Sequence, residues 1–481
     1  MAKSVKVNFA YNLINSISGL LFPLVTFPYA SRILLADGIG QVNFYLSIIN
    51  YVTLFTSIGI PLYATREVAR VRNDNIKVSI TTIEILLLHL VLTILGYFVV
   101  FMMSLSIEKV QENLSLFLIL SGSIVFTTIG CEWFYKGIED FRYITIRNIC
   151  FKILCAFSLF VLVKSKEDLL TYGILSILGT VGNNVFNFLR LKKYVPFSYI
   201  FLKEISPLRH LKPSLHIFVL NLAVSIYVNL DPIMLGFMKD AASVGYYTAA
   251  TKISHVFLGI TSALQAAMLP RLSNLYHQKD YEQFYLLAQK AIDFVFFLCT
   301  PLFLGLIVLS PALIVLFCGD TYIPSIMTLQ LISPVILFIA LSGVIGIQIL
   351  YPQGKENIVI CSTILGAIVN LLLNFILIPI YAHDGAAVST AIAEFSVTAS
   401  VFVFGYKYLH IKSLSLHYAN CIIGGFVMFL VCIFVRKLDL GFYHEIILIP
   451  LVGGLSYLAY LYVMRDSFLK YCYNMIRLNK H

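Results

Sequence analysis

Long apolar runs, separated by short polar segments, repeat along the whole chain. A helix that crosses the hydrocarbon core of a bilayer needs about 20 mainly apolar residues. The pattern therefore predicts an all-α polytopic membrane protein with about fourteen transmembrane helices. The runs of this length lie at about 7–30, 40–63, 78–105, 114–135, 143–163, 169–189, 213–237, 244–269, 287–309, 325–350, 357–380, 385–406, 417–435 and 444–463.

The composition supports lipid as the solvent of this chain. Of its 481 residues, 59% are hydrophobic and 12% are charged, whereas a soluble domain carries about a quarter charged residues. The mean hydropathy is +0.88. No predicted connection is long enough for a soluble catalytic domain, and the longest polar stretch, residues 190–212, is typical of a linker between two halves.

The basic residues indicate how the helices are oriented. The net charge is +10, but the charges are spread over many short loops and form no compact patch, which argues against nucleic-acid binding. If the N-terminus is cytoplasmic, 26 of the 34 Lys and Arg residues lie at cytoplasmic segments and eight on the other side. Because Lys and Arg favour cytoplasmic loops, we expect a multi-pass protein with both termini in the cytoplasm.

Two segments about 205 residues apart have a similar character. Gly38 and Gly40 precede the second predicted helix, and Val244 and Gly245 open the eighth. Parallel repeats with a substrate site between the halves are a known transporter plan, although glycines recur in any membrane protein. The segments predict two six-helix lobes and two further C-terminal helices. The boundaries are an N-terminal lobe at 1–190, a linker at 191–212, a second lobe at 213–406, and two helices with a basic tail at 407–481.

Motifs for enzymatic or metal chemistry are missing from the sequence. The nine cysteines are scattered, without a Cys-x-x-Cys pair or a Cys/His cluster at ligand spacing. Gly38-Ile-Gly40 follows no strand and lacks the third glycine of a nucleotide-binding loop. We therefore predict no catalytic residues, no metal site, no structural disulfide and no cofactor.

Ionisable residues inside predicted spans are costly, so each is a candidate functional residue. Asp231 lies in the seventh span directly before Pro232, and Lys252 lies about eight residues into the eighth, or roughly 12 Å at 1.5 Å per residue. The two could pair across neighbouring helices, either as a structural ion pair or facing a wet cavity. Glu394 lies in the middle of the twelfth span. It could carry a coupling proton, since burial raises the pKa of a carboxyl, or could simply hydrogen-bond to nearby Ser and Thr.

Arg32 ends the first predicted helix and is one of the few basic residues on the outer side. A guanidinium at the mouth of a cavity suits an anionic head group, because it can hold a phosphate through two hydrogen bonds. The alternative is an arginine that only anchors the helix at the membrane interface. We take Arg32 and Lys252 as candidates for substrate binding, and Asp231 and Glu394 as candidates for coupling or gating.

Several short segments, in order and spacing, resemble the polysaccharide biosynthesis protein family, which includes O-antigen and capsule repeat-unit flippases. That family is part of the superfamily of multidrug, oligosaccharidyl-lipid and polysaccharide exporters. The resemblance covers residues 7–406 and, more loosely, the remainder. The segments are Tyr29-Ala-Ser-Arg32, Gly38-Ile-Gly40-Gln-Val-Asn-Phe, Gly59-Ile-Pro61, Trp133-Phe-Tyr-Lys-Gly137, Leu230-Asp231-Pro232, Val244-Gly245-Tyr246-Tyr247, Leu269-Pro270-Arg271, Asn370-Leu-Leu-Leu-Asn374 and Gly385-Ala-Ala387.

The resemblance implies a flippase of the bacterial inner membrane, with two MATE-like lobes that alternate around a central cavity without ATP hydrolysis. The implied substrate is an undecaprenyl-pyrophosphate-linked oligosaccharide, moved from the cytoplasmic to the periplasmic leaflet. A coupling ion, H⁺ or Na⁺, and a polysaccharide polymerase partner are further expectations. The glycan is left open.

Two other functions compete with this interpretation. A multidrug or cation exporter of the same superfamily would need an acid-rich cavity, and the outer-side basic residues argue against a cationic substrate. A membrane enzyme acting on lipid-linked sugars would need a large outer loop with catalytic residues. The longest predicted outer loop, residues 310–324, carries Asp320 as its one charged residue.

Overall fold

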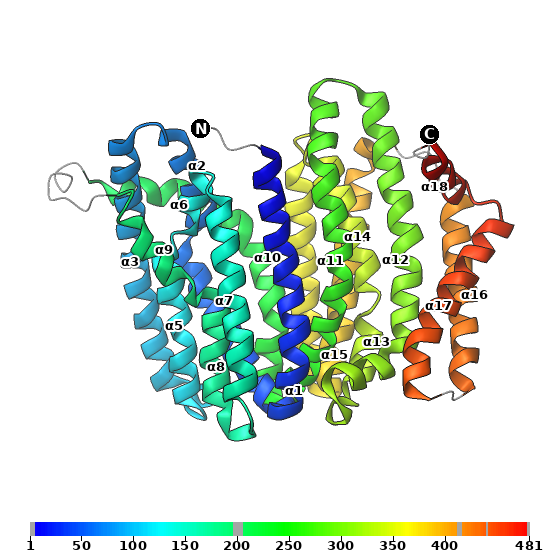
Figure 1. Ribbon diagram of the computed structural model, residues 1–481, viewed down its shortest axis with the longest axis horizontal. Helices are drawn as coiled ribbons and strands as arrows, with labels where there is room; N and C mark the ends of the chain where they lie inside the picture. Colours follow the sequence, from blue (N-terminus) through cyan, green and yellow to red (C-terminus); the bar gives the residue numbers. More distant parts are fainter. Residues whose placement is uncertain (1–4, 196–204, 411–415, 439–440, 479–481) are drawn as a thin grey trace. The chain divides into compact units, whose positions relative to one another are not determined.

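The computed structural model describes residues 5–195, 205–410, 416–438 and 441–478, and every regular element in these ranges is a helix. Figure 1 shows the helices coloured along the chain. Within the described residues, nine helices are long and apolar enough to cross a membrane, or ten if the bent pair at Lys166–Gly182 and Asn184–Leu191 forms one span. The predicted fold class, an all-α polytopic membrane protein, is confirmed.

The chain divides into two compact units, Met1–Gly245 and Tyr246–His481. The lobes predicted at 1–190 and 213–406, the linker at 191–212 and the segment at 407–481 stay a prediction, and residues 1–4, 196–204, 411–415, 439–440 and 479–481 of these ranges lie outside the described residues. The structure groups the predicted seventh helix with unit 1, where it packs against the long helix that contains the first two predicted spans.

In unit 1, α1 packs against the helices α3, α5, α7 and α10. A π segment at Leu178–Gly182 interrupts the sixth predicted span, and a 3-10 turn at Lys166–Asp168 precedes it. The elements are α1 (Val5–Ser57), α2 (Ile60–Val71), α3 (Asn75–Ser106), α4 (Glu108–Gln111), α5 (Leu114–Gly130), α6 (Glu132–Gly137), α7 (Phe141–Leu162), η1 (Lys166–Asp168), α8 (Leu169–Ile177), η2 (Leu178–Gly182), α9 (Asn184–Leu191), η4 (Pro207–His210) and α10 (Leu211–Met238).

Unit 2 begins inside α11, and its longest helices are α12 and α15. The helices α16 and α17 pack against each other and against α12. They correspond to the two predicted C-terminal helices. The elements are α11 (Ala241–His277), α12 (Tyr281–Cys318), η5 (Asp320–Tyr322), α13 (Ser325–Ile332), α14 (Val335–Gly343), η6 (Val344–Leu350), α15 (Glu356–Leu409), α16 (Leu416–Lys437), α17 (Phe442–Val463) and α18 (Ser467–Leu478).

Two long helices each contain a sharp break between two predicted spans. In α1 the backbone of Leu35 has φ 59° and ψ −175°, and in α15 that of Ala382 has φ 49° and ψ −126°. A positive φ is unfavourable for residues with a side chain, so tertiary packing holds both breaks. The predicted gaps at 31–39 and 381–384 are thus tight reversals around a single non-helical residue.

A fully buried carboxylate ties η4 to the rest of unit 1. The side chain of Glu84 on α3 accepts a hydrogen bond from the Ser206 backbone at 2.7 Å and contacts His210 Nε2 at 2.9 Å. It also forms an ion pair with Arg209. On the other side of the ring, His210 Nδ1 contacts the Tyr63 hydroxyl of α2 at 2.7 Å. These contacts fix the segment that leads into α10.

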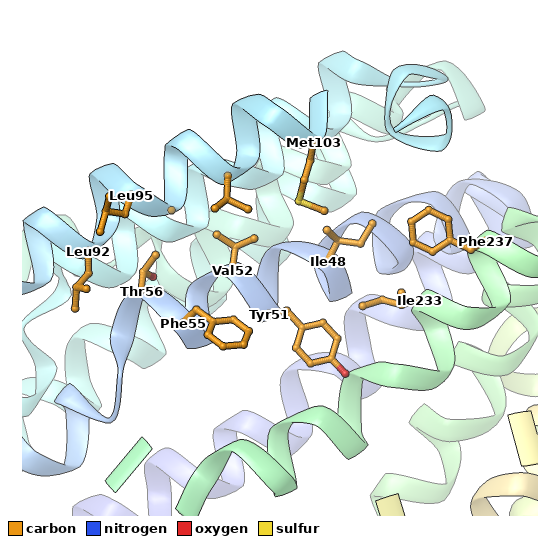
Figure 2. A pocket seen from close by; sticks show the side chains of 12 residues that line it. Ile48, Tyr51, Val52, Phe55, Thr56, Leu92, Leu95, Met103, Ile233 and Phe237 are labelled. Atoms are coloured by element: carbon orange, nitrogen blue, oxygen red, sulfur yellow. The ribbon is translucent and has the colours of Figure 1, made fainter. Parts of the chain in front are cut away.

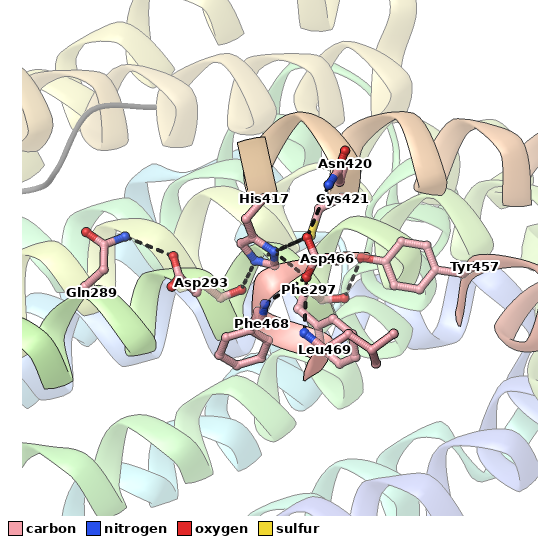
Figure 3. A network of polar contacts seen from close by, with 10 residues as sticks. All are labelled: Gln289, Asp293, Phe297, His417, Asn420, Cys421, Tyr457, Asp466, Phe468 and Leu469. Atoms are coloured by element: carbon pink, nitrogen blue, oxygen red, sulfur yellow. Dashed lines mark hydrogen bonds and ion pairs between the residues drawn. The ribbon is translucent and has the colours of Figure 1, made fainter. Parts of the chain in front are cut away.

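A second buried pair joins three helices of unit 2 (Figure 3). Asp466, between α17 and α18, lies 2.9 Å from Nδ1 of His417 on α16, and both side chains are almost fully buried. Nε2 of His417 lies 3.0 Å from the backbone oxygen of Asp293 on α12. Both ring nitrogens therefore face acceptors, and a doubly protonated imidazolium satisfies them.

The Asp466 carboxylate also caps α18, because it accepts hydrogen bonds from the backbone N–H groups of Phe468 and Leu469 at 3.0 and 3.1 Å.

We expect Asp466→Ala to lower the free energy of unfolding by about 3–5 kcal/mol, because it leaves the His417 charge buried without its partner. Thermal unfolding of the purified protein measures this effect. Asp280 is the matched control, since it caps α12 through one bond to the Gln283 backbone at 3.1 Å, and its alanine variant should lose about 1 kcal/mol. Equal losses in the two variants would contradict a paired role for Asp466.

The pKa of Asp466 gives the same interaction a pH dependence. Burial alone would raise this pKa, but the hydrogen bonds from His417 and the Leu469 backbone hold it below the ordinary value of 3.8. The stabilisation is therefore fully present above pH 3.8 and is lost as the pH falls through the lowered pKa.

Candidate functional site

The first half of α1 carries a polar face, although it crosses the predicted membrane. Asn12 and Ser16 are exposed, and Asn15 and Ser18 are half-buried beside them. Residues at this spacing lie on one side of a helix. The opposite side exposes Leu13, Ile17 and Leu21, as expected for contact with lipid. A polar face on a spanning helix indicates contact with water or a polar ligand.

Helix α7 places a lysine beside this polar face. Lys152 Nζ donates a hydrogen bond to the Ser18 hydroxyl at 3.2 Å, and one turn earlier Asn148 donates to the Asn15 side chain at 3.1 Å. Lys152 is half-buried and makes no ion pair with a carboxylate in the described part of the chain. We call Asn12, Asn15, Ser16, Ser18, Asn148 and Lys152 the α1–α7 site.

Arg147 adds a second cation next to this site. Its side chain is 5% exposed, and its Nη2 atom donates to the Asn148 side chain at 2.8 Å. The nearest carboxylate that pairs with it is Glu132 of α6, at 3.6 Å. Two cations therefore lie within one spanning helix, and among the described residues Glu132 is the carboxylate that pairs with either of them, which favours an anionic ligand over a cationic one.

At the break in α1, two small-residue segments touch backbone to backbone. A Cβ atom on Gly40 would overlap the carbonyl group of Ala241, and one on Gly245 would overlap that of Ala36. The contact is reciprocal, and Gly40 and Gly245, like Ala36 and Ala241, are 205 positions apart, as expected of repeat-related segments. Small residues allow helices to approach this closely, so the glycines are required where the start of α11 meets α1.

Asp231 lies buried on α10, one residue before Pro232. Asn229, two residues earlier on α10, faces the second half of α1, which carries Tyr51. One residue before Tyr51, the Asn50 side chain donates a hydrogen bond to Asn229 at 3.2 Å. Asp231 therefore lies two residues from a polar contact between α1 and α10 in unit 1.

An apolar cavity of about 460 Å³ adjoins this contact. Figure 2 shows Val52 and Phe55 of α1, Leu95 of α3 and Phe237 of α10 around it, with the Tyr51 hydroxyl directed toward α10. Its walls supply almost no hydrogen-bonding groups, and burying a polar group without partners is costly. This cavity is therefore unsuited to a sugar or a phosphate.

Arg32 is exposed on α1, three residues before the break at Leu35. The helix beneath it is held by Tyr29, whose hydroxyl donates to the backbone oxygen of Val163 at 2.8 Å. The position of Arg32 just before the break in α1 agrees with the predicted end of the first span. Its role in binding an anion stays a prediction.

Lys252 and Glu394 both lie in unit 2. The start of α11 lies beside the second half of α15, because the rings of Tyr246 on α11 and His383, directly after the break in α15, are in contact with centroids 5.2 Å apart. Tyr247 and Thr390 hydroxyls meet at 3.2 Å, and Lys252 and Glu394 follow five and four residues further along. The two ionisable residues therefore lie at similar depth in one unit.

Glu394 continues a buried polar stripe. The Asn370 amide lies 3.5 Å from the Thr390 hydroxyl, and the Asn374 amide lies 3.2 Å from Asn370. Glu394 itself is 6% exposed. The predicted pairing of Asp231 with Lys252 involves residues of different units and stays a prediction, as do the coupling roles of Asp231 and Glu394.

Sequence reasoning missed Lys152 and Arg147. Both lie inside the predicted span at 143–163, so the rule that selected Asp231, Lys252 and Glu394 would have found them too. The charge distribution used for the orientation of the helices places both residues with the basic residues of the cytoplasmic side. Among the described residues, no group of three or more His, Cys, Asp or Glu side chains is arranged to hold a metal ion.

Comparisons with known proteins identify relatives along most of the chain. A family model described as "Polysaccharide biosynthesis protein" matches residues 5–276, and one described as "MatE" matches residues 217–376. A "Putative O-antigen transporter" of Escherichia coli (strain K12) is 24% identical over 83% of this chain and 96% of its own. A protein of the same description from Shigella dysenteriae is 29% identical over 78% of this chain and 93% of its own.

Two solved structures share the fold. The lipid II flippase MurJ in an inward closed conformation superposes with a TM-score of 0.69 and 17% identity, over 96% of this chain and 99% of that one. An inward-facing MATE family multidrug transporter of the MOP superfamily gives a TM-score of 0.66 and 15% identity, over 81% of this chain and 94% of that one. At these identities the likeness establishes the helical architecture.

Proposed function

The chain belongs to the polysaccharide biosynthesis protein family, and from this membership we propose that it is a flippase that moves a lipid-linked oligosaccharide across a bacterial inner membrane. The observation that carries the proposal is the α1–α7 site, a polar and cationic surface inside the predicted membrane. The names of the O-antigen transporters and of the lipid II flippase support the same substrate class.

The physical problem that such a protein solves is the transfer of a charged head group through hydrocarbon. A pyrophosphate-sugar head cannot cross about 30 Å of apolar core unaided. A hydrated surface with Lys152 lowers that cost, because the cation balances the phosphate charge while sugar hydroxyls bond to the side chains of Asn12, Asn15 and Ser16. The lipid tail stays in the bilayer throughout.

Finer features of the proposal follow from the sequence. The carrier is undecaprenyl pyrophosphate, and the head group moves from the cytoplasmic to the periplasmic leaflet, with both termini of the chain in the cytoplasm. Arg32 and Lys252 contact the anionic head at other depths. Asp231 and Glu394 couple the movement to H⁺ or Na⁺ or gate the cavity, and the polymer is completed by a separate polysaccharide polymerase. The chain performs transport and no covalent step.

Deleting the gene in its own host tests the function. We expect surface polysaccharide to be lost while the lipid-linked oligosaccharide accumulates, because synthesis continues but the product stays in the inner leaflet. Lipid extraction and surface staining measure the two pools, and re-expression of the chain should restore both. Failure to form the lipid-linked oligosaccharide would instead indicate an enzyme. Unchanged polysaccharide with a new sensitivity to cationic drugs would indicate a multidrug exporter.

A further inference from the structure

A second cationic surface of unit 1 lies on the side of α7 that faces α9. It is a pocket of about 530 Å³. Its basic residues are Arg147, Arg190 and Lys193, and no acidic residue is among the described residues that line it. The pocket is open to the surroundings of the bundle through Cys150 and Leu189, which are exposed.

The cations of this pocket are balanced only in part by carboxylates outside its lining, since Arg147 shares Glu132, at 3.6 Å, with Lys136. Arg190 has one ion pair, with Asp140 at 2.9 Å, and its guanidinium stacks on the Tyr143 ring at 3.8 Å. Arg147 lies 5.4 Å from the same ring, and its Nε and Nη1 atoms are buried without a hydrogen-bond partner in the described part of the chain. Buried donors of this kind are costly unless an acceptor reaches them. Lys193 is exposed.

The rest of the pocket is apolar and aromatic. The rings of Phe151 and Phe186 pack edge to face with centroids 5.3 Å apart, and Phe186 and Leu189 are about half exposed on the surface of the helices. Basic residues above apolar side chains between transmembrane helices suit a lipid, whose phosphate and chains need both environments.

We propose that this pocket binds the phosphate of an anionic phospholipid, as a site separate from that of the transported molecule. The phosphate accepts hydrogen bonds from Arg147 and Arg190, and Lys193 contributes charge at the rim. The acyl chains lie along Phe151, Phe186 and Leu189. The proposal goes beyond the proposed function, because it holds whatever molecule the chain transports.

Cys150 provides a direct test, because it lines the pocket and is exposed. The full-length protein is placed in nanodiscs of phosphatidylcholine, with or without phosphatidylglycerol, and treated with a membrane-permeable maleimide. We expect phosphatidylglycerol to slow the labelling of Cys150. Cys361, which is also exposed but lies on α15 in unit 2, should be labelled at the same rate in both discs. Mass spectrometry separates the two sites.

Two neighbouring lysines supply matched variants. Lys192 and Lys193 are both exposed, and Lys193 alone of the two lines the pocket. Lys193→Gln should weaken protection by phosphatidylglycerol about fivefold, the contribution of one basic residue near an anionic membrane, and Lys192→Gln should not. Equal labelling in both kinds of disc, or equal effects of the two variants, would overturn the proposal. Protection by inorganic phosphate in phosphatidylcholine discs would assign the site to the free ion and overturn the lipid assignment.

Discussion

Gly40→Ala is expected to remove glycan export and to lower the thermal stability of the purified protein. The added Cβ would overlap the backbone carbonyl of Ala241, and a carbonyl inside a helix cannot rotate away as the end of a side chain can. Forcing extra atoms into a packed contact costs about 1–3 kcal/mol, and at this junction the start of α11 would have to shift away from α1. Export is measured as surface polysaccharide at equal membrane abundance.

The control for this substitution is Gly122 on α5, where an added Cβ would meet no atom within 4 Å. Alanine favours a helix by about 1 kcal/mol over glycine, so Gly122→Ala should keep full export and equal or higher stability. Gly245→Ala should behave like Gly40→Ala, because its Cβ would overlap the carbonyl of Ala36. If Gly40→Ala exports and unfolds as the unmodified protein does, the close contact of α1 with α11 is not required.

Lys152→Met should also abolish export, but without loss of stability. Methionine keeps most of the length of the side chain and removes its charge, so the phosphate of the substrate would lose a partner inside the membrane. Removing one partner of a buried charge pair weakens binding by about 2–5 kcal/mol. Lys152→Arg keeps the charge with a different shape and should retain part of the export. The measurements are surface polysaccharide, membrane abundance and thermal unfolding.

Arg142 is the matched control for Lys152, because it lies on α7 as well and is exposed. Arg142→Met removes the same charge outside the α1–α7 site and should leave export unchanged. Normal export from Lys152→Met at normal abundance would exclude Lys152 from head-group binding. A loss of export in Lys152→Met together with a lower unfolding temperature would assign Lys152 to holding α7 against α1.

The positions of the helices followed directly from local patterns. The run at 213–237 corresponds to α10 (Leu211–Met238), and the run at 325–350 corresponds to α13, α14 and η6, which end at Leu350. The gap between 380 and 385 contains the break at Ala382. Such agreement is expected, because the free energy of placing a segment in lipid is close to a sum over its own residues.

The polar contacts were far less accessible to sequence reasoning. Asp231 and Glu394 are buried, as expected of ionisable residues in spans. The partner of Lys152 is Ser18, which lies 134 residues earlier, and that of Asp466 is His417, 49 residues earlier. No local pattern marks such pairs, because a hydrogen bond depends on which helix faces come together in the folded chain.

The amino-acid sequence alone determined that this is a membrane protein, roughly which residues form each spanning helix, and to which family the chain is related. Hydrophobicity and short motifs are properties of neighbouring residues, so a single chain records them in full. Only the tertiary structure decided that Lys152 and Arg147 form a cationic surface beside the polar face of α1, and that Gly40 and Gly245 touch opposite backbones. These features arise from packing between segments that are distant in the sequence. Close packing and the free-energy cost of burying a charge allow only a few arrangements of the helices, and local sequence patterns do not identify which ones.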